Sequence, residues 1–182
     1  MKNYYTKMKL PEPLVPALQA LSLLKGQTAL VTGANSGIGR AIAVSLGRAG
    51  ANVVVNYVVK PEEAEAVVVE IQGGGGHAVA IRADVGDEAQ VVAMFAEAVK
   101  AFGTVDILVS NAGMERNAPF HEMTTAQWDA VMNVNLRGAF LCAREAVREF
   151  LRRGVRPEVS VAAGKIIFIS SVHELIPWAG HV

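Results

Sequence analysis

The sequence predicts an α/β domain built on a doubly wound, mostly parallel sheet that stops after its fifth strand. Short β-branched runs alternate with longer helical patterns from Gln27 onward, which is typical of βαβ units. Each short run is nearly all apolar, as expected for strands covered on both faces. A glycine-rich turn joins the first strand directly to the first helix.

The expected elements follow from these patterns in order. Apolar, β-branched composition places strands at 28–32, 52–57, 77–82, 105–110 and 165–170. Helical periodicity places helices at 37–49, 61–72, 87–102 and 125–153. Capping-box pairs mark two helix starts, Asp87 with Gln90 and Thr124 with Gln127. The glycine run 73–76 ends a helix and is a loop rather than a phosphate site, because no strand leads into it.

The chain divides into a short extension and one domain. Residues 1–25 contain three prolines before an apolar patch, which predicts a loose tail leading to a short packed helix. Residues 26–182 form the nucleotide-binding domain, which we expect to be incomplete at its C-terminus. With 182 residues, 52% of them hydrophobic, the chain is long enough to bury a sizeable core.

Composition excludes several classes of function. Lysine plus arginine equals aspartate plus glutamate at 17 each, so no overall charge favours nucleic acid or a membrane surface as a partner. Cys142 is the single cysteine, which excludes an internal disulfide and a cysteine-cluster zinc site, and we expect no metal. No apolar run approaches the ~18 residues of a spanning helix, so we expect a cytoplasmic protein.

The glycine-rich turn has the residue pattern of a dinucleotide site. One glycine permits the tight turn, one lets backbone amides approach a pyrophosphate, and one lets the helix pack against the strand. The positive helix end then faces the phosphates. The candidate residues are Gly33, Asn35, Ser36, Gly37, Ile38 and Gly39. The alternative is a tight strand-to-helix connection that binds no ligand.

Three further segments follow the ends of later strands, where ligands of open α/β sheets bind. They are Asp84-Val85, Asn111-Ala112-Gly113 and Ile169-Ser170-Ser171. With the glycine spacing G-x-x-x-G-x-G, this series resembles the short-chain dehydrogenase/reductase family from about Lys25 to Val182. The resemblance implies a Rossmann-type fold, an NAD(P)-dependent oxidoreductase and a homo-oligomeric intact enzyme.

The resemblance also implies roles for these residues. Asp84 would bind the adenine amino group while Val85 packs beside the ring, although Asp84 could instead cap the following turn. Asn111, Ala112 and Gly113 would steady the central sheet and lie beside the adenosine ribose.

Two further residues would assist the chemistry. Asn135 would hold a water of the proton relay, or else face solvent. Ser171 would orient the reacting carbonyl or hydroxyl, or else serve as a turn serine. The family's catalytic tyrosine and the lysine four residues after it would follow Ser171, but the chain ends at Val182 first. We therefore expect a fragment that is inactive alone.

Cofactor choice depends on the end of the second strand. An acidic residue there would bind the ribose hydroxyls and repel a 2′-phosphate. The sequence has Asn56-Tyr57 instead, so Asn56 is the candidate cofactor-binding residue there, and the glycine loop has Ser36 rather than arginine. We therefore expect NAD or NADP, with dual use or a lean toward NADP.

Substrate identity rests on two segments, Gly113–Glu115 and 170–178, which resemble those of bacterial glucose 1-dehydrogenases. Glu115 and His173 are then candidate sugar contacts, or alternatively an interface charge and a loop residue. The segment from Arg152 to Lys165 is longer than in such relatives, and its arginines are most simply a solvated loop. The alternatives are a 3-oxoacyl or other carbonyl reductase and a non-catalytic NAD(P)-binding module.

Overall fold

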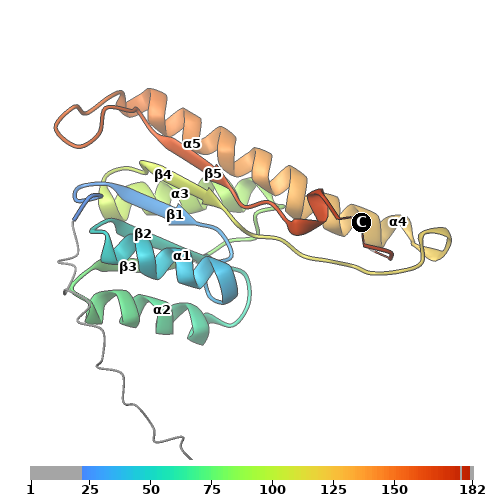
Figure 1. Cartoon of the computed structure of the whole chain (residues 1–182). Coiled ribbons are helices and arrows are strands. Elements are labelled where there is room, and N and C mark those ends of the chain that lie inside the picture. The colour runs from blue at the N-terminus through green and yellow to red at the C-terminus, as the bar shows by residue number, and fades with distance from the viewer. Residues whose placement is uncertain (1–21, 177, 181–182) are drawn as a thin grey trace, which may run out of the picture.

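The computed structural model describes residues 22–176 and 178–180, and it has the predicted α/β architecture (Figure 1). Five strands, all parallel, form one sheet in the order β3-β2-β1-β4-β5. The strands are β1 (Thr28–Val31), β2 (Asn52–Tyr57), β3 (His77–Arg82), β4 (Ile107–Ser110) and β5 (Lys165–Phe168). Most of the predicted N-terminal extension, residues 1–21, lies outside the described residues.

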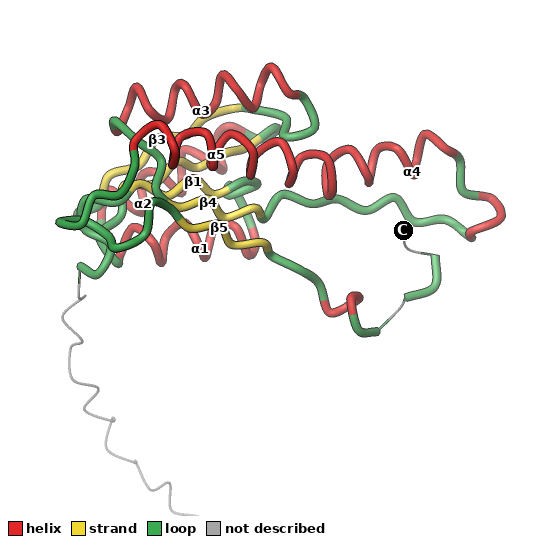
Figure 2. Tube along the Cα trace, turned by 90° about the horizontal axis from the view of Figure 1, so that it is seen from above, coloured by secondary structure: helices red, strands yellow, loops and turns green. Residues whose placement is uncertain are grey.

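Helices cover both faces of the sheet, as a doubly wound fold requires (Figures 1 and 2). One face carries α1 (Gly37–Arg48) and α2 (Pro61–Gly73), and the other carries α3 (Glu88–Phe102) and α5 (Ala139–Arg153). The last helix begins as α4 (Thr125–Met132), passes through the π-helical turn η2 (Asn133–Gly138) and continues as α5. Short 3₁₀ turns occur at η1 (Phe120–Glu122) and η3 (Val172–Glu174). Among the described residues, no helix is long and apolar enough to cross a membrane.

Alternating strand residues divide the core between the two faces. Val53 and Val55 pack with α1 and α2, while Leu30 and Val54 pack with α3 and α5. Both groups are fully buried, which explains why the strands read as continuous apolar runs. The hydrophobic burial on both faces holds the strand ends, and the loops that follow them, in fixed relative positions.

The strand order reverses between β1 and β4. From β1 the chain moves outward through β2 and β3, and then returns to the opposite side of β1 to form β4 and β5. The loops after β1 and β4 therefore diverge to opposite faces and leave a crevice at the carboxyl ends of these strands. This topological switch point is where a ligand site is expected.

The prediction that every strand is covered on both faces is wrong for β5. Ile166 packs against the core of α3 and α5, but Ile167 and Phe168 are exposed at 46% and 58%. β5 pairs only with β4 in the described part of the chain, so it is an edge strand there. An edge position leaves apolar side chains open even where the sequence reads as a buried strand.

The two predicted capping boxes differ in the structure. Thr124 and Gln127 exchange both reciprocal hydrogen bonds, as predicted. Asp87 accepts from the backbone N–H of Gln90 at 3.1 Å, but Gln90 Oε1 accepts from the N–H of Asp84 rather than from that of Asp87. Gln90 thereby ties the end of β3 to α3, which extends the cap into the loop that precedes it.

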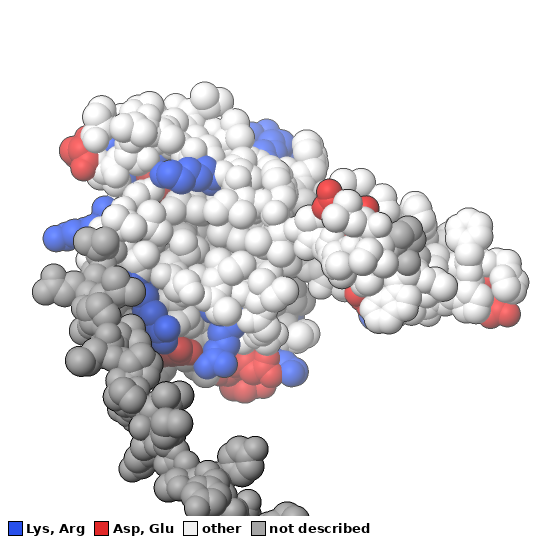
Figure 3. Space-filling view, in the orientation of Figure 1, with Lys and Arg blue, Asp and Glu red and all other residues white. Residues whose placement is uncertain are grey.

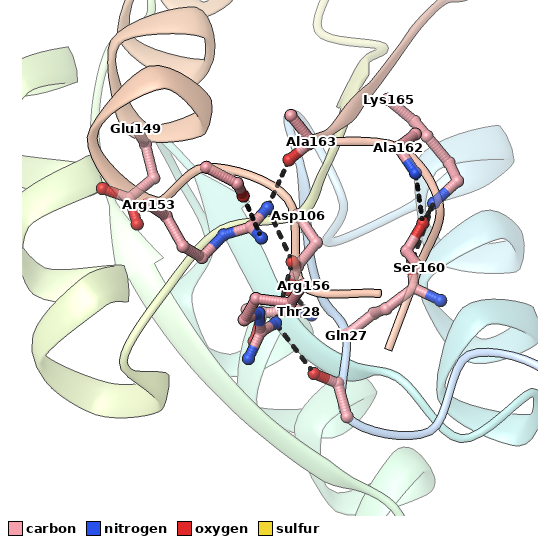
Figure 4. Close-up of polar contacts among 12 residues, drawn as sticks. Gln27, Thr28, Asp106, Glu149, Arg153, Arg156, Ser160, Ala162, Ala163 and Lys165 are labelled. Atoms are coloured by element: carbon pink, nitrogen blue, oxygen red, sulfur yellow. Dashed lines mark hydrogen bonds and ion pairs between the residues drawn. The ribbon is translucent and has the colours of Figure 1, made fainter. Parts of the chain in front are cut away.

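The prediction that Arg152, Arg153 and Arg156 belong to a solvated loop is wrong for Arg153, the last residue of α5, and for Arg156. Arg153 and Arg156 both form ion pairs with Asp106 Oδ1 at 3.0 Å (Figure 4). Asp106 is 2% exposed and its other oxygen accepts from the N–H of Thr28 at 2.8 Å. Lys165 extends the network by donating to Gln27 and to the loop. The loop is therefore fastened to the amino edge of the sheet, opposite the switch point.

Candidate functional site

A hollow of about 1040 Å³ lies at the carboxyl ends of β4 and β5. It brings together eight of the residues that the sequence nominated: Ile38, Asn111, Ala112, Gly113, Glu115, Asn135, Ser171 and His173. They come from four separate segments that only the sheet brings together.

The buried side chain of Asn56 supports the glycine loop through a hydrogen bond to Gly33. The Asn56 side chain is 1% exposed, and its Oδ1 accepts from the N–H of Gly33 at 3.1 Å. Its amide donates to the carbonyls of Ile81 and Ala83 at the end of β3. The side chain that we nominated for the cofactor thus lies beneath the loop, where it supports Gly33 rather than presenting itself to a ligand.

Close backbone approach explains two of the glycines. Gly33 has φ of 61°, a left-handed conformation that favours glycine. At Gly39 a Cβ atom would collide with the carbonyl of Gly33 and the side chain of Asn111. The loop therefore folds tightly enough to bring the start of α1 against the end of β1.

Thr32 was missed by the sequence reasoning. Its hydroxyl accepts from the backbone N–H groups of Asn111 and Ala112, both at 2.9 Å. Asn111 Nδ2 in return donates to the carbonyls of Thr32 and Gly33 at 2.9 and 3.2 Å. These bonds join the two sides of the switch point. A buried hydroxyl residue at the last position before the glycine loop is the signal that could have identified it.

The start of α1 is open to a ligand. Ser36 is the N-cap, but its side chain makes no capping hydrogen bond, and the first N–H groups of a helix have no partner within it. A Cβ at Gly37 would meet nothing within 4 Å, so open space lies over the turn. Ile38 is 66% exposed and lines the hollow. Exposed amides, a positive helix end and free space fit the pyrophosphate of a dinucleotide.

Asn35 points away from this opening toward α2. Its Nδ2 donates to Glu63 Oε2 at 3.2 Å and lies 3.4 Å from the carbonyl oxygen of Val59. The side chain thus connects the glycine loop to the turn between β2 and α2. The sequence pattern identified Asn35 as a residue of the glycine loop but did not predict its contact with Glu63.

Asn135 lies within the π-helical turn η2. Its Oδ1 accepts from the N–H of Met114 at 2.9 Å, and its Nδ2 donates to the Met114 carbonyl at 3.0 Å. The side chain therefore fixes the segment after β4 against the long helix. A π-turn widens the helix locally and is frequent at functional sites. Asn135 still lines the hollow beside Gly113 and Ser171.

Ser171 and His173, from the segment after β5, also line the hollow. Ser171 Oγ accepts from the N–H of His173 at 3.2 Å, so the serine caps η3 as well as facing the hollow. His173 Nδ1 lies 3.0 Å from the carbonyl oxygen of Ile176, and its ring lies 4.9 Å from that of Trp178. Glu115 lines the same space. His121 and Glu122 form an exposed pair in η1, away from the hollow's lining.

Asp84 and Val85 do not line this hollow. Asp84 Oδ1 accepts from the N–H of Gly86 at 2.9 Å, which is the turn-capping contact considered as its alternative role. Val85 is 3% exposed and packs in the core, where a Cβ at Gly138 would collide with it. Its side chain is therefore a packing contact for the long helix rather than a surface against which a ring could lie.

The charge around the site is mixed. On the face drawn in Figure 3, Lys and Arg are interspersed with Asp and Glu and form no continuous field of one sign. Within the site, specificity must therefore come from individual groups and not from a summed potential. Cys142 lies in the core beneath α5, where burial raises its pKa to about 12. Its thiol is therefore protonated at neutral pH.

Comparisons with known proteins agree on one family. The family model for the short chain dehydrogenase matches residues 27–182. The short chain dehydrogenase claC of Passalora fulva is 47% identical over 131 residues, which are 72% of this chain and 49% of that protein. A short chain dehydrogenase of Claviceps purpurea (strain 20.1) is 49% identical over 148 residues, which are 81% of this chain and 52% of that protein.

A solved structure extends the similarity to three dimensions. A crystal structure from Sinorhizobium meliloti 1021, assigned to the short-chain alcohol dehydrogenases, matches with a TM-score of 0.80 at 34% identity. The match covers 89% of this chain and 61% of that one. The chain spans about half the length of the curated relatives that it matches.

Proposed function

We propose that this chain, which belongs to the short chain dehydrogenase family, is the NAD(P)-binding part of an oxidoreductase. The observation that carries the proposal is the convergence of the open α1 terminus, Asn111, Asn135 and Ser171 at one switch point. A nicotinamide cofactor, when bound, supplies the hydride acceptor or donor. The residues of this chain would bind it, orient the substrate and hold the proton-transfer groups in place.

The roles of the cofactor-binding residues follow from their contacts. The N–H groups at the start of α1, from Ser36 to Gly39, would hold the pyrophosphate. Asn111, Ala112 and Gly113 would lie beside the adenosine ribose, held there by Thr32. Asp84 would accept from the adenine amino group with the lone pairs that its bond to Gly86 leaves free.

Two residues would act nearer the reaction. Ser171 would donate a hydrogen bond to the reacting oxygen, because its hydroxyl accepts from His173 and so keeps its own proton available. Asn135 would hold a water of the proton relay through the second lone pair of its oxygen, while its bonds to Met114 fix its orientation. No tyrosine lies between Ser171 and Val182 in the sequence. We therefore propose that the 182-residue chain binds cofactor without turnover.

The substrate that we favour is a sugar or another secondary alcohol, as in glucose 1-dehydrogenases. Glu115 and His173 line the hollow and would supply hydrogen-bonding partners to adjacent hydroxyls. The apolar part of the lining favours the second candidate, a carbonyl reductase acting on a less polar ketone. That part includes Leu136, Phe140, Phe168 and Ile169.

We also propose that the intact enzyme is a homo-oligomer. The long helix exposes Leu136, Phe140 and Leu151, at 61%, 59% and 79%. Exposed apolar side chains on one helix favour association. Sedimentation velocity would detect it, and a monomer at all concentrations would contradict it.

Calorimetric titration of the 182-residue chain with NAD⁺ and with NADP⁺ tests the proposed function. We expect at least one dinucleotide to bind, with no change in nicotinamide absorbance on adding β-D-glucose. The Gly39→Ala variant serves as the negative control, because its Cβ would disrupt the loop. Failure of both dinucleotides to bind would contradict cofactor binding, and turnover by this chain would contradict its lack of activity.

A further inference from the structure

A second hollow, of about 530 Å³, lies between the loop after β3, the start of α3 and the π-helical turn η2. Most of its lining residues are polar or charged: Asp84, Gly86, Asp87, Glu88, Ala89, Asn133 and Arg137. Of these, the roles proposed above use only Asp84, which would accept from the adenine amino group. The hollow therefore borders the proposed adenine position.

Arg137 connects the two sides of this hollow. Its Nη1 donates to the Gly86 carbonyl at 2.8 Å and to Asn133 Oδ1 at 3.0 Å. Among the lining residues that the structure describes, Arg137 alone is a cation, whereas three of the others are acidic. Hydrogen bonds from a charged donor are stronger than those between neutral groups. The guanidinium therefore links η2 firmly to the loop after β3.

Gly86 is held at both of its peptide groups. Its N–H donates to Asp84 Oδ1 at 2.9 Å, and its carbonyl accepts from Arg137. Gly86 is buried, and a Cβ atom there would collide with the side chain of Asn133. Because a glycine backbone has little conformational preference of its own, these contacts determine its orientation. The orientation of Gly86 in turn fixes the carboxylate of Asp84.

The turn η2 also holds the loop after β4. Asn133 and Arg137 contact each other and the loop after β3, whereas Asn135, midway between them, exchanges two hydrogen bonds with the backbone of Met114. Loss of the Arg137 side chain would leave the two bonds of Asn135 in place. Its effect on a bound dinucleotide should therefore be confined to the adenine end.

We propose that Arg137 is a positioning residue that holds Asp84 in the orientation in which it recognises the adenine amino group. This inference rests on the proposed function. Without Arg137, the Gly86 carbonyl loses its donor, and the turn 84–86 samples orientations in which Asp84 faces away from the base. The cofactor must then order the turn itself, which lowers its affinity. Only the part of the affinity that depends on the amino group is lost.

A dinucleotide with hypoxanthine in place of adenine separates this role from a general loss of structure. Hypoxanthine carries an oxygen where adenine carries its amino group, so it offers Asp84 no donor. In calorimetric titrations of the full chain, NAD⁺, or NADP⁺ if it binds more tightly, should be preferred over its hypoxanthine analogue by about tenfold. Arg137→Met has no donor and should reduce this preference to about twofold or less. Arg137→Lys keeps a charged donor and should restore part of it.

The matched control is Arg144→Met. Arg144 Nη2 lies 2.6 Å from Glu88 Oε1, so this variant removes the same charge and a contact to the start of α3, while the bond to Gly86 remains. Its preference should equal that of the unchanged chain. Asp84→Ala should abolish the preference, and adding Arg137→Met to it should change nothing further. Circular dichroism verifies folding, and Arg137→Gln replaces Arg137→Met, with the same expected result, if the latter does not fold.

The outcomes separate the two proposals. Binding of neither NAD⁺ nor NADP⁺ to the unchanged chain would overturn the proposed function, and this inference with it. Equal affinity of the unchanged chain for the adenine and hypoxanthine dinucleotides would overturn the inference alone. So would an Arg137→Met variant that binds both dinucleotides more weakly by the same factor, because the role of Arg137 would then be merely structural. An equal loss of preference in Arg144→Met would also overturn it, since the loss of charge would then explain the effect.

Discussion

Asp106 anchors the amino edge of the sheet, and replacing it with asparagine isolates the contribution of its charge. Its carboxylate is 2% exposed and accepts from the N–H of Thr28 while pairing with two guanidinium groups. Asp106→Asn keeps the size of the side chain and one oxygen for Thr28. It leaves Arg153 and Arg156 without a counter-charge (Figure 4). The perturbation is therefore electrostatic and not steric.

The magnitude follows from the burial of the two arginines. Removing one partner of a buried ion pair costs roughly 3–5 kcal/mol, because the remaining charge is left desolvated. The side chain of Arg153 is 9% exposed, so its share is near the full cost, whereas that of Arg156 is 31% exposed and is partly screened. We expect Asp106→Asn to lower the free energy of unfolding by about 3 kcal/mol.

Urea unfolding followed by circular dichroism measures this loss. Asp129→Asn is the matched control, since Asp129 is exposed on α4, and it should change stability by less than about 0.5 kcal/mol. In the Asp106→Asn background, Arg153→Met should cost at least about 1 kcal/mol less than it does alone. A loss below about 1 kcal/mol for Asp106→Asn, or strict additivity with Arg153→Met, would refute the reasoning.

Three further predictions concern the site and the core. Gly39→Ala should destabilise the chain by about 1–3 kcal/mol, because its Cβ would collide with the carbonyl of Gly33. Gly73→Ala, whose Cβ would meet nothing within 4 Å, should be neutral or slightly stabilising; equal melting curves for the two variants would contradict this. Thr32→Val should cost about 2 kcal/mol in urea unfolding, because two backbone N–H groups lose their acceptor, and Thr32→Ser should cost less. Burial raises the pKa of Cys142 to about 12, so iodoacetamide should label it only in denaturant; mass spectrometry of the native chain would reveal any exception.

Local pattern in the sequence determined the elements and the place of the site. The strands at 52–57 and 77–82 have the predicted bounds, because apolar runs between turn residues mark buried parallel strands. The other strands end one or two residues earlier or begin later than predicted. The glycine loop and the capping box at Thr124 could also be predicted from the sequence, because each depends on residues within a few positions of one another.

Only the tertiary structure decided what the individual side chains do. Asn56 and Val85 follow strands as cofactor-binding residues would, yet both are buried, and the sequence does not say which way a side chain at a strand end turns. The sequence predicted a solvated loop for Arg153 and Arg156, at and after the end of α5, because their partner Asp106 lies 47 and 50 positions earlier in the chain. The same holds for Thr32, whose partners Asn111 and Ala112 lie across the switch point, directly after β4. The spacing of apolar residues along the sequence predicts which side chains are buried. The pairing of polar groups, in contrast, depends on contacts that form only when the sheet brings distant strands together.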